Sequence, residues 1–302
     1  MGRRWPHKFA GAVLACSIHG NASAQPVAVT DDSGARVELA APARRIITLA
    51  PHATEMLFEV GAGAHIVGTV EYSDYPDAAL KIPRVGSYPQ IDMERLVALH
   101  PDLVVVWGSG NAGSLMPRLA ALKIPAYMTE PHTLEDVAQS MEKLGLLAGR
   151  GAEAQAVGRA FRARRDALAA RYGGRARVRV FYEIWNRPLT TVNGRHLISH
   201  VLALCGGENV FANATSIAPA VGEEAVLAAN PEAIVASNDN PKRTALLDDW
   251  KRWTMLTAVA RGNLFDIPPE LMQRHSPRIL EGAAQLCDYL ETVRRRRPAA
   301  AG

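Results

Sequence analysis

The sequence predicts an α/β fold of two similar lobes, each with a mostly parallel sheet, joined by one long helix. A unit at residues 92–107 combines a short helix, a break at His100-Pro101 and a continuous apolar strand at 103–106. The unit recurs at 223–236 in the same order, and a glutamate precedes the proline by seven residues in both copies, Glu94 and Glu224. A repeat of this length indicates two related lobes and not a solenoid.

Strands alternate with helices along the first half, which favours a mostly parallel sheet. Asp92 is a good N-cap for the helix of the repeat unit, and Thr133 opens a later helix with a capping-box pattern. A hairpin is expected first, at 26–41. Strands are then expected at 45–49, 66–70, 103–106 and 126–128, and helices at 55–60, 92–99 and 112–122.

A helix is expected at 152–172, with apolar residues along one face and arginines on the other, until Gly173-Gly174 ends it. A helix of about 20 residues is about 30 Å long, which is enough to span a small domain. The second lobe begins with a strand at 178–182 and ends with a helix at 277–293. The chain is thus expected to divide into a leader at 1–24, an N-terminal lobe at 25–148, a linking helix at 149–174, a C-terminal lobe at 175–293 and a basic tail at 294–302.

The first 24 residues have the pattern of a cleaved secretory signal peptide. Basic residues up to Lys8 precede an apolar stretch at 9–18, and the small residues Ala22-Ser23-Ala24 precede the expected cleavage site before Gln25. Lipidation at Cys16 is less favoured, because it would leave an apolar stretch of only about seven residues. The mature protein is therefore expected in the periplasm.

The charge of the mature protein gives no reason to expect nucleic-acid binding. The leader carries three of the 34 basic residues, and Arg294 to Arg297 add four more near the C-terminus. The remaining body has 27 basic residues against 30 acidic ones, so the basic charge is concentrated at the two ends.

Only two cysteines remain after cleavage, Cys205 and Cys287. In an exported protein the first interpretation of such a pair is one disulfide. A metal or redox pair is the less favoured alternative, since the two residues are far apart and form no CxxC motif.

The sequence contains no catalytic signature: it lacks a G-x-S-x-G elbow, a P-loop, an H-E-x-x-H motif and a G-x-G-x-x-G turn after a strand. His196 and His200 lie four residues apart on an expected helix, but such a pair is more often incidental than a metal site. We therefore predict neither an enzyme, nor a bound metal, nor a cofactor.

Aromatic residues follow several predicted strands at their carboxyl ends, where open α/β sheets bind ligands. Aromatic side chains there offer flat apolar faces with a polar edge, which suit a large amphipathic ring system. The alternative is that each fills the core, and this is favoured for Trp250 and Trp253 on a helical face. The expected site aromatics at these strand ends are Tyr72, Tyr75, Tyr88, Trp107 and Trp185.

Glu94 and Glu224 open the equivalent helices of the two units. Each would stabilise its helix through the helix dipole, and this alone would explain them. A matched pair could equally dock on basic pockets of a partner. The residues by themselves leave both interpretations open.

Several motifs resemble the periplasmic cobalamin-binding proteins of ABC importers, over residues 44–291. These proteins belong to the helical-backbone receptors for cobalamin, siderophores and haem, also called class III periplasmic binding proteins. The motifs are R-I-I-T-L-A-P at 45–51, Y-S-D-Y-P at 72–76, E-R-L-V-A-L at 94–99 with P-D-L-V at 101–104, C-G-G-E-N-V-F at 205–211 and S-P-R-I at 276–279 with L-C at 286–287.

The resemblance implies that the protein captures cobalamin or a related corrinoid between its lobes and delivers it, as a monomer, to an ABC permease. Cobalamin is then a transported ligand and not a cofactor. Glu94 and Glu224 would meet arginines of the permease, and Cys205 and Cys287 match the family's disulfide. The ligand-binding residues would be Pro51, His52, Tyr72, Tyr75, Tyr88, Trp107, Trp185, Glu270, Leu271, Met272, Gln273 and Arg274.

Some positions depart from the family pattern. Tyr88 and Ala218 stand where cobalamin binders have tryptophan, and Leu271 and Met272 stand where aromatic residues are expected. These departures leave a haem or iron-siderophore receptor of the same family as the alternative function. A receptor for anionic iron-siderophores would need a basic cleft, for which Arg187, Arg195 and Arg274 are the candidates.

Overall fold

The computed structural model describes residues 1–2, 25–87, 90–237 and 247–298. Tyr88, the leader from residue 3 to residue 24 with Cys16, and the last four residues lie outside the described ranges. None of the helices in those ranges combines the length and the apolar character needed to cross a membrane.

The two lobes contain four-stranded parallel sheets of identical topology. In the first lobe the order is β4-β3-β5-β6, and in the second it is β10-β7-β11-β12. Counted along each lobe, both orders are 2-1-3-4, so the predicted duplication is confirmed. The strands are β3 (Ile46–Thr48), β4 (Ile66–Thr69), β5 (Leu103–Trp107), β6 (Ala126–Thr129), β7 (Val178–Glu183), β10 (Gly207–Asn209), β11 (Ala233–Ala236) and β12 (Leu264–Asp266).

The repeat unit has the same backbone in both lobes. Helices α2 (Met93–Ala98) and α7 (Glu223–Ala229) precede β5 and β11. His100 and Asn230, each directly before a proline, both have a positive φ, +43° and +40°. Because the residue before a proline avoids the right-handed helical region, each helix ends there and the chain turns into its buried strand.

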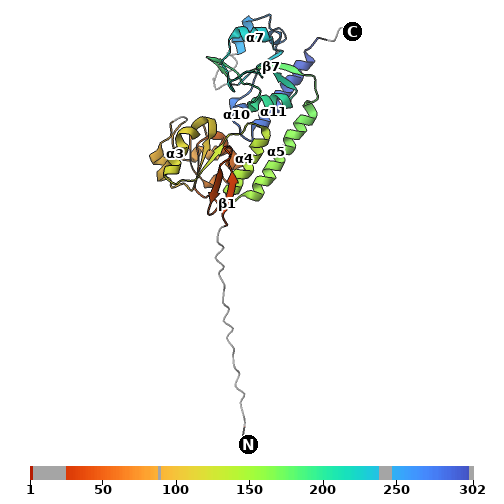
Figure 1. The fold of residues 1–302 in the computed structure, drawn as a ribbon. Helices are drawn as coiled ribbons and strands as arrows, with labels where there is room; N and C mark the ends of the chain where they lie inside the picture. Colours follow the sequence, from red (N-terminus) through yellow and green to blue (C-terminus); the bar gives the residue numbers. More distant parts are fainter. Residues whose placement is uncertain (3–24, 88–89, 238–246, 299–302) are drawn as a thin grey trace.

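The remaining elements cover the sheets and connect the lobes (Figure 1). An antiparallel hairpin of β1 (Val27–Thr30) and β2 (Arg36–Leu39) lies at the N-terminal end, and a second, β8 (Trp185–Asn186) with β9 (Leu189–Thr190), follows β7. The helices are α1 (Pro51–Glu59), α3 (Gly113–Ala121), α4 (Leu134–Leu147), α5 (Gly151–Tyr172), α6 (Leu197–Leu204), α9 (Thr257–Ala260), α10 (Pro269–Met272) and α11 (Ile279–Arg295).

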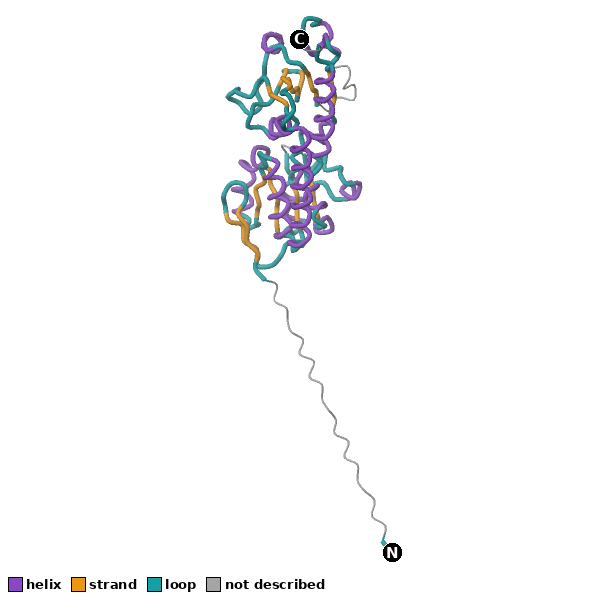
Figure 2. Tube along the Cα trace, turned by 90° about the vertical axis from the view of Figure 1, so that its right-hand side faces the viewer, coloured by secondary structure: helices purple, strands orange, loops and turns teal. Residues whose placement is uncertain are grey.

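The long helix α5 runs beside both lobes, as Figures 1 and 2 show. It packs against α4 of the first lobe and against α6 and α11 of the second. Ala154, Phe161 and Tyr172 are buried on its apolar face, and one core cluster continues from the first lobe to the second beneath it. The predicted connection of the two lobes by one long helix is therefore confirmed.

The expected basic tail does not begin at residue 294. Helix α11 continues to Arg295, and the next arginines fold back onto the second lobe. Arg296 donates to the side chain of Asn263 (3.1 Å), and Arg297 pairs with Glu232 (2.8 Å). These hydrogen bonds to β-strand ends anchor residues 294–297 within the lobe.

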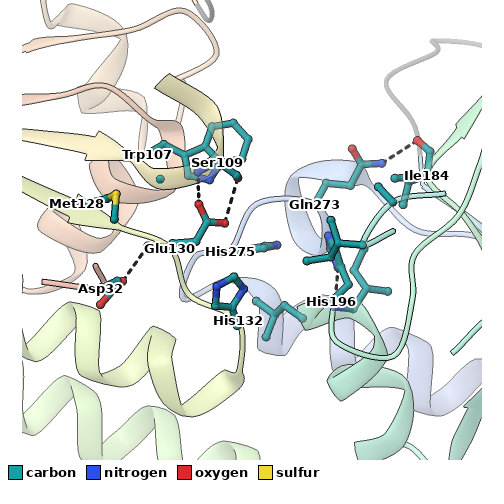
Figure 3. A pocket seen from close by; sticks show the side chains of 15 residues that line it. Asp32, Trp107, Ser109, Met128, Glu130, His132, Ile184, His196, Gln273 and His275 are labelled. Carbon is teal, nitrogen blue, oxygen red and sulfur yellow. Dashed lines mark hydrogen bonds between the residues drawn. The ribbon is translucent and has the colours of Figure 1, made fainter. Parts of the chain in front are cut away.

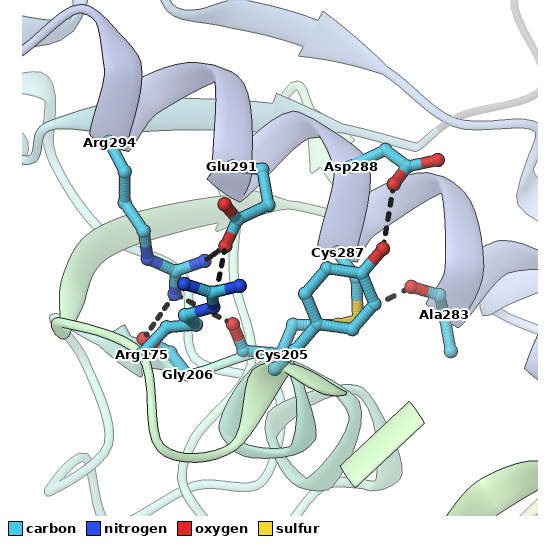
Figure 4. Close-up of a disulfide and its surroundings, with 9 residues drawn as sticks. Arg175, Cys205, Gly206, Ala283, Cys287, Asp288, Glu291 and Arg294 are labelled. Carbon is cyan, nitrogen blue, oxygen red and sulfur yellow. Dashed lines mark hydrogen bonds and ion pairs between the residues drawn. A yellow bond between two sulfur atoms is a disulfide. The ribbon is translucent and has the colours of Figure 1, made fainter. Parts of the chain in front are cut away.

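Cys205 and Cys287 form the predicted disulfide within the second lobe (Figure 4). Cys205 ends α6 and Cys287 lies in α11, and both are fully buried. Arg294 closes one side of the pair, where it donates to the Cys205 carbonyl (2.8 Å). The bridge therefore fastens the last helix, α11, to the end of α6.

Trp250 belongs to the core, as predicted. It lies in a 3-10 turn at Asp249–Arg252, which directly follows the helical residues 247–248 and directly precedes Trp253. Its indole packs edge-on against Phe181 (5.6 Å) and donates to Glu183 (2.8 Å).

Candidate functional site

Two adjoining cavities lie between the lobes and form one cleft. The larger has a volume of about 600 Å³ and the smaller about 270 Å³. Trp107, Gln273 and His275 line both cavities, so these three residues mark the waist of the cleft. Figure 3 shows the larger cavity, with Trp107, Ser109 and Glu130 on one wall and Gln273, Ile184 and His196 on the other.

The cleft lies at the carboxyl ends of the strands in both lobes. Trp107 is the last residue of β5, Tyr72 follows β4 by three positions, and Glu130 directly follows β6. From the second lobe, Ile184 directly follows β7. This is the edge where open α/β sheets bind ligands, and here two such edges face each other.

The turn after β5 explains the position of Trp107. Asn111 accepts from the Trp107 amide (2.9 Å) and donates to the Leu49 carbonyl of the neighbouring strand (2.8 Å). A Cβ at Gly110 would lie 2.1 Å from the Trp107 ring, so only glycine allows the turn to approach so closely. This tight turn at residues 107–111 thus fixes the indole at the cleft.

The structure brings seven of the expected ligand-binding residues to the cleft. Tyr72 lies at its rim, where 72% of its surface is exposed and its φ is +63°. The seven residues are Pro51, His52, Tyr72, Trp107, Glu270, Gln273 and Arg274.

Two expected residues of α10 do not line the cleft. Leu271 and Met272 are buried in the core, because α11 packs directly on α10. A Cβ at Gly282 of α11 would lie 2.6 Å from the Leu271 carbonyl and 2.7 Å from the Met272 sulfur. The expectation that these side chains line the site is wrong.

Tyr75 and Trp185 also lie outside both cavities. The Arg278 guanidinium stacks on the Tyr75 ring at 3.9 Å. Trp185 is 50% exposed on the β8–β9 hairpin, and its indole donates to the Arg187 carbonyl (3.0 Å). Trp185 lies outside the cavities because the chain leaves the sheet immediately after Ile184 and enters this hairpin.

Several cleft residues were missed. Glu130 and His132 lie just after the carboxyl end of β6, and Trp107 lies at the carboxyl end of β5. The strand-end rule that predicted Trp107 could therefore have predicted Glu130 and His132 as well. His196 could not be found this way, because it lies at the start of α6 and caps it by accepting from the Ile198 amide (3.2 Å). The missed lining residues are Asp32, Leu49, Val70, Glu71, Gly108, Ser109, Met128, Glu130, His132, Ile184, His196, Leu197, Ile198, Ile217, Pro269 and His275, together with Ala218, whose departure from the family pattern had been noted.

Burial keeps His52, His196 and His275 neutral at neutral pH. Desolvation, helped by the charge of His275, lowers the pKa of His52 to about 3 and that of His196 to about 3. Burial also lowers the pKa of His275. The His275 ring meets the His196 ring edge-on (5.3 Å), and the His52 ring meets Trp107 in the same way (6.0 Å). The rings at and beside the waist of the cleft are therefore uncharged imidazoles and an indole.

Arg274 lines the smaller cavity but does not offer an uncompensated charge. Its guanidinium pairs with Glu55 (3.1 Å) and Asp74 (2.6 Å). Burial opposes ionisation of Asp74, but the hydrogen bond and charge of Arg274 outweigh it and lower the Asp74 pKa. Arg187 and Arg195, the other candidates for a basic cleft, line neither cavity.

Within the described ranges, no three histidine, cysteine or acidic side chains lie close enough together to hold a metal ion. Glu94 and Glu224 are exposed in the first turns of α2 and α7 and form no ion pair with any described residue. Neither glutamate lines the cleft.

The buried His52 predicts a stability that falls in acid. The unfolded chain binds a proton at this side chain below a pKa of about 6.5, whereas the folded protein does not until about pH 3. The free energy of unfolding therefore decreases as the pH falls below 6.5, and His52 accounts for about 2 kcal/mol of the loss at pH 5. Thermal unfolding of ligand-free His52→Gln should show a correspondingly smaller loss between pH 7 and pH 5.

The exposed His100 supplies the control, since His100→Asn should retain the full pH dependence of the parent protein. Glu183 acts in the opposite direction, because burial raises its pKa to about 7 and its contribution is lost as the pH rises from 4.5 to 7. The informative quantity is therefore the difference between variant and parent. Equal pH dependence in His52→Gln and the parent contradicts the buried neutral imidazole.

The comparisons with known proteins agree with this geometry. Residues 46–271 match the family model described as periplasmic binding protein. The vitamin B12-binding protein of Vibrio parahaemolyticus is 36% identical over 259 residues, which cover 85% of this chain and 92% of that protein. The chain belongs to the periplasmic binding protein family.

Among solved structures, the periplasmic vitamin B12 binding protein BtuF of Vibrio cholerae superposes with a TM-score of 0.79 at 33% identity, covering 84% of this chain and 99% of that one. The periplasmic heme-binding protein RhuT from Roseiflexus has a TM-score of 0.73 at 19% identity, over 83% and 98% of the two chains. At that identity the second similarity shows the common fold alone.

Proposed function

We propose that the protein captures cobalamin or a related corrinoid in the cleft and delivers it to an ABC permease. The observation that carries this function is the cleft between the facing carboxyl edges of two equal sheets, with Trp107 at its waist. A cleft of this size suits a large ring ligand, and Trp107 supplies an aromatic surface for it. The similarity to proteins named for vitamin B12 binding supports the same ligand.

The charges of the cleft favour a corrinoid over haem or an anionic siderophore. His52 and His196 are neutral, Arg274 is compensated, and Glu71, Glu130 and Glu270 are acidic. Haem carries two carboxylates, which such a lining repels, whereas the corrin periphery carries neutral amides. Gln273, Ser109 and the imidazoles can hydrogen-bond with amides.

One residue of the cleft lining, Ala218, is compatible with a related corrinoid as well as with cobalamin itself. Ala218 lines the larger cavity at the position where the cobalamin binders were expected to have a tryptophan. The smaller side chain leaves more room at that wall, so a corrinoid with a different lower ligand fits the same proposal.

The location and the mode of action follow from the same proposal. Export by a signal peptide cleaved after Ala24 places the protein in the periplasm, where it acts as a monomeric binding protein and not as an enzyme. Glu94 and Glu224 support docking to the permease. They begin crossover helices, whose N-termini lie at the carboxyl edges of the sheets, so one exposed acid flanks the cleft on each lobe.

Thermal unfolding with and without cyanocobalamin tests the binding function. A ligand that binds only the folded state stabilises it by about 2.7 kcal/mol when present at 100 times its dissociation constant. The melting temperature of the mature protein is expected to rise with cyanocobalamin concentration. An unchanged melting temperature at millimolar cyanocobalamin contradicts the proposal.

Trp107→Ala is expected to weaken cyanocobalamin binding by about thirtyfold, because truncation of an aromatic anchor costs about 2 kcal/mol. Folding should change little, since Trp107 is only partly buried. Titration of the variant against cyanocobalamin measures the effect. Tyr88→Ala is expected to have the same effect, although Tyr88 lies outside the described residues.

Trp250→Ala is the matched control, since Trp250 is a buried tryptophan away from both cavities. It should lower the melting temperature and leave the affinity largely unchanged. If Trp250→Ala controls affinity while Trp107→Ala changes only stability, the cleft is not the ligand site.

A further inference from the structure

Beside the smaller cavity, four charged side chains connect the two lobes. Glu55 projects from α1 of the first lobe, and its side chain is only 3% exposed. Arg278, at the start of α11 of the second lobe, donates to both oxygens of this carboxylate (3.0 and 2.9 Å). Arg274 donates to the same carboxylate (3.1 Å).

A second set of contacts comes from the loop after β4. Asp74 accepts two hydrogen bonds from Arg274 (2.6 and 3.2 Å), a bidentate pairing that fixes the guanidinium plane. Tyr75 lies under the Arg278 guanidinium at 3.9 Å. Glu55, Asp74 and Tyr75 of the first lobe thus hold Arg274 and Arg278 of the second. We name these five residues the inter-lobe latch.

The latch lies next to the residues that line the cleft from the second lobe. Gln273 and His275, which line both cavities, flank Arg274 in the chain. Gln273 in turn donates to the carbonyls of Ile184 and Ser237, at the ends of β7 and β11. A shift of Arg274 away from the first lobe would therefore move the lining of the cleft with it.

We propose that the inter-lobe latch sets the width of the cleft and slows the release of its ligand, with Glu55, Asp74, Tyr75 and Arg278 as positioning residues. This inference rests on the proposed function for the identity of the ligand. The latch acts through geometry: apart from Arg274, its members line neither cavity. These four positioning residues thus control the site without contacting the ligand.

Burial makes the latch difficult to open. The side chains of Glu55, Arg274 and Arg278 are 3%, 17% and 14% exposed. Separating the lobes at this edge would leave a buried carboxylate and two arginines without partners, which is strongly unfavourable until water reaches them. A ligand enclosed in the cleft leaves only after such an opening, so the latch should act mainly on the dissociation rate.

The test uses Glu55→Gln and Arg278→Gln in the full mature chain. The dissociation rate of cyanocobalamin is measured by rapid mixing with an excess of a competing binder. The distance between the lobes is measured in the same variants, with and without ligand, by spin labels at Leu122→Cys and Met255→Cys. Both positions are exposed, and the native cysteines are engaged in the disulfide.

Both latch variants are expected to release cyanocobalamin at least tenfold faster and to show longer or broader distances between the labels. Arg278→Lys keeps the charge but not the bidentate contact, so it should restore part of the slow release. Asp74→Asn removes only the outer, half-exposed ion pair of the latch, between Asp74 and Arg274. It replaces Glu55→Gln as the test variant if Glu55→Gln does not fold. It should change both readouts in the same direction, to a smaller extent.

Arg162→Gln is the matched control. Arg162 also joins two carboxylates, Glu135 (2.7 Å) and Glu142 (2.5 Å), but within the α4–α5 pair away from the cleft. It should lower stability without changing release or label distance.

Faster release with unchanged label distances in the latch variants overturns the latch and indicates direct ligand contact. Failure of the parent protein to bind cyanocobalamin rejects the proposed function, whereas the label distances in the ligand-free protein still decide the latch.

Discussion

Substitution of Glu94 or Glu224 by arginine is expected to abolish ligand uptake while leaving ligand affinity nearly unchanged. Both side chains are exposed, begin equivalent helices and lie outside the cleft. If they meet arginines of the permease, each substitution replaces attraction with like-charge repulsion that costs several kcal/mol. Uptake of labelled cyanocobalamin by cells, compared with titration of the purified variants, separates docking from binding.

The control is Glu153→Arg, which changes an exposed glutamate in the first turn of α5. Since α5 is the linking helix and contributes to neither cavity, uptake should remain. Loss of ligand affinity in Glu94→Arg or Glu224→Arg contradicts the docking role, and so does an equal loss of uptake in Glu153→Arg.

Removal of the disulfide is expected to lower the free energy of unfolding by about 4.5 kcal/mol, the chain-entropy value for a loop of this length. The bridge closes a sequence separation of 82 residues and joins the end of α6 to α11. Urea unfolding of Cys205→Ser/Cys287→Ser against the parent, both without ligand, measures the difference.

Labelling with a thiol reagent tests whether the disulfide is formed. The parent protein, denatured without reduction, should present no reactive thiol, and after reduction it should present two. Two labelled cysteines before reduction contradict the bridge, and an unchanged urea midpoint in the double variant contradicts its contribution to stability.

The fold could be predicted because its signals are local and repeated. The break at His100-Pro101, the apolar run of β5 and the recurrence of both near Pro231 determine a strand–helix order that leaves few topologies. The arginines after Val293 were misjudged, because their charge suggested a free tail. Their actual partners, such as Glu232, lie far away in the sequence.

The strand pattern predicts the site only where a strand end determines it, whereas Glu270, Gln273 and Arg274 were expected from the family resemblance alone. Trp107, Tyr72 and His52 follow strands and reach the cleft, and Glu130 could have been found by the same rule. The positions of Leu271 and Met272 depend on which helix packs over α10. The pairing of Arg274 with Glu55 joins residues 219 positions apart, and no local pattern encodes such a contact.

Isothermal titration of the mature protein with cyanocobalamin and with haemin measures the central claim most directly. We expect cyanocobalamin to bind with a stoichiometry of one per chain. Haemin should bind far more weakly, because its carboxylates meet an acidic cleft whose described lining residues include no uncompensated arginine. Saturable binding of haemin, with no heat from cyanocobalamin, would contradict the proposed function.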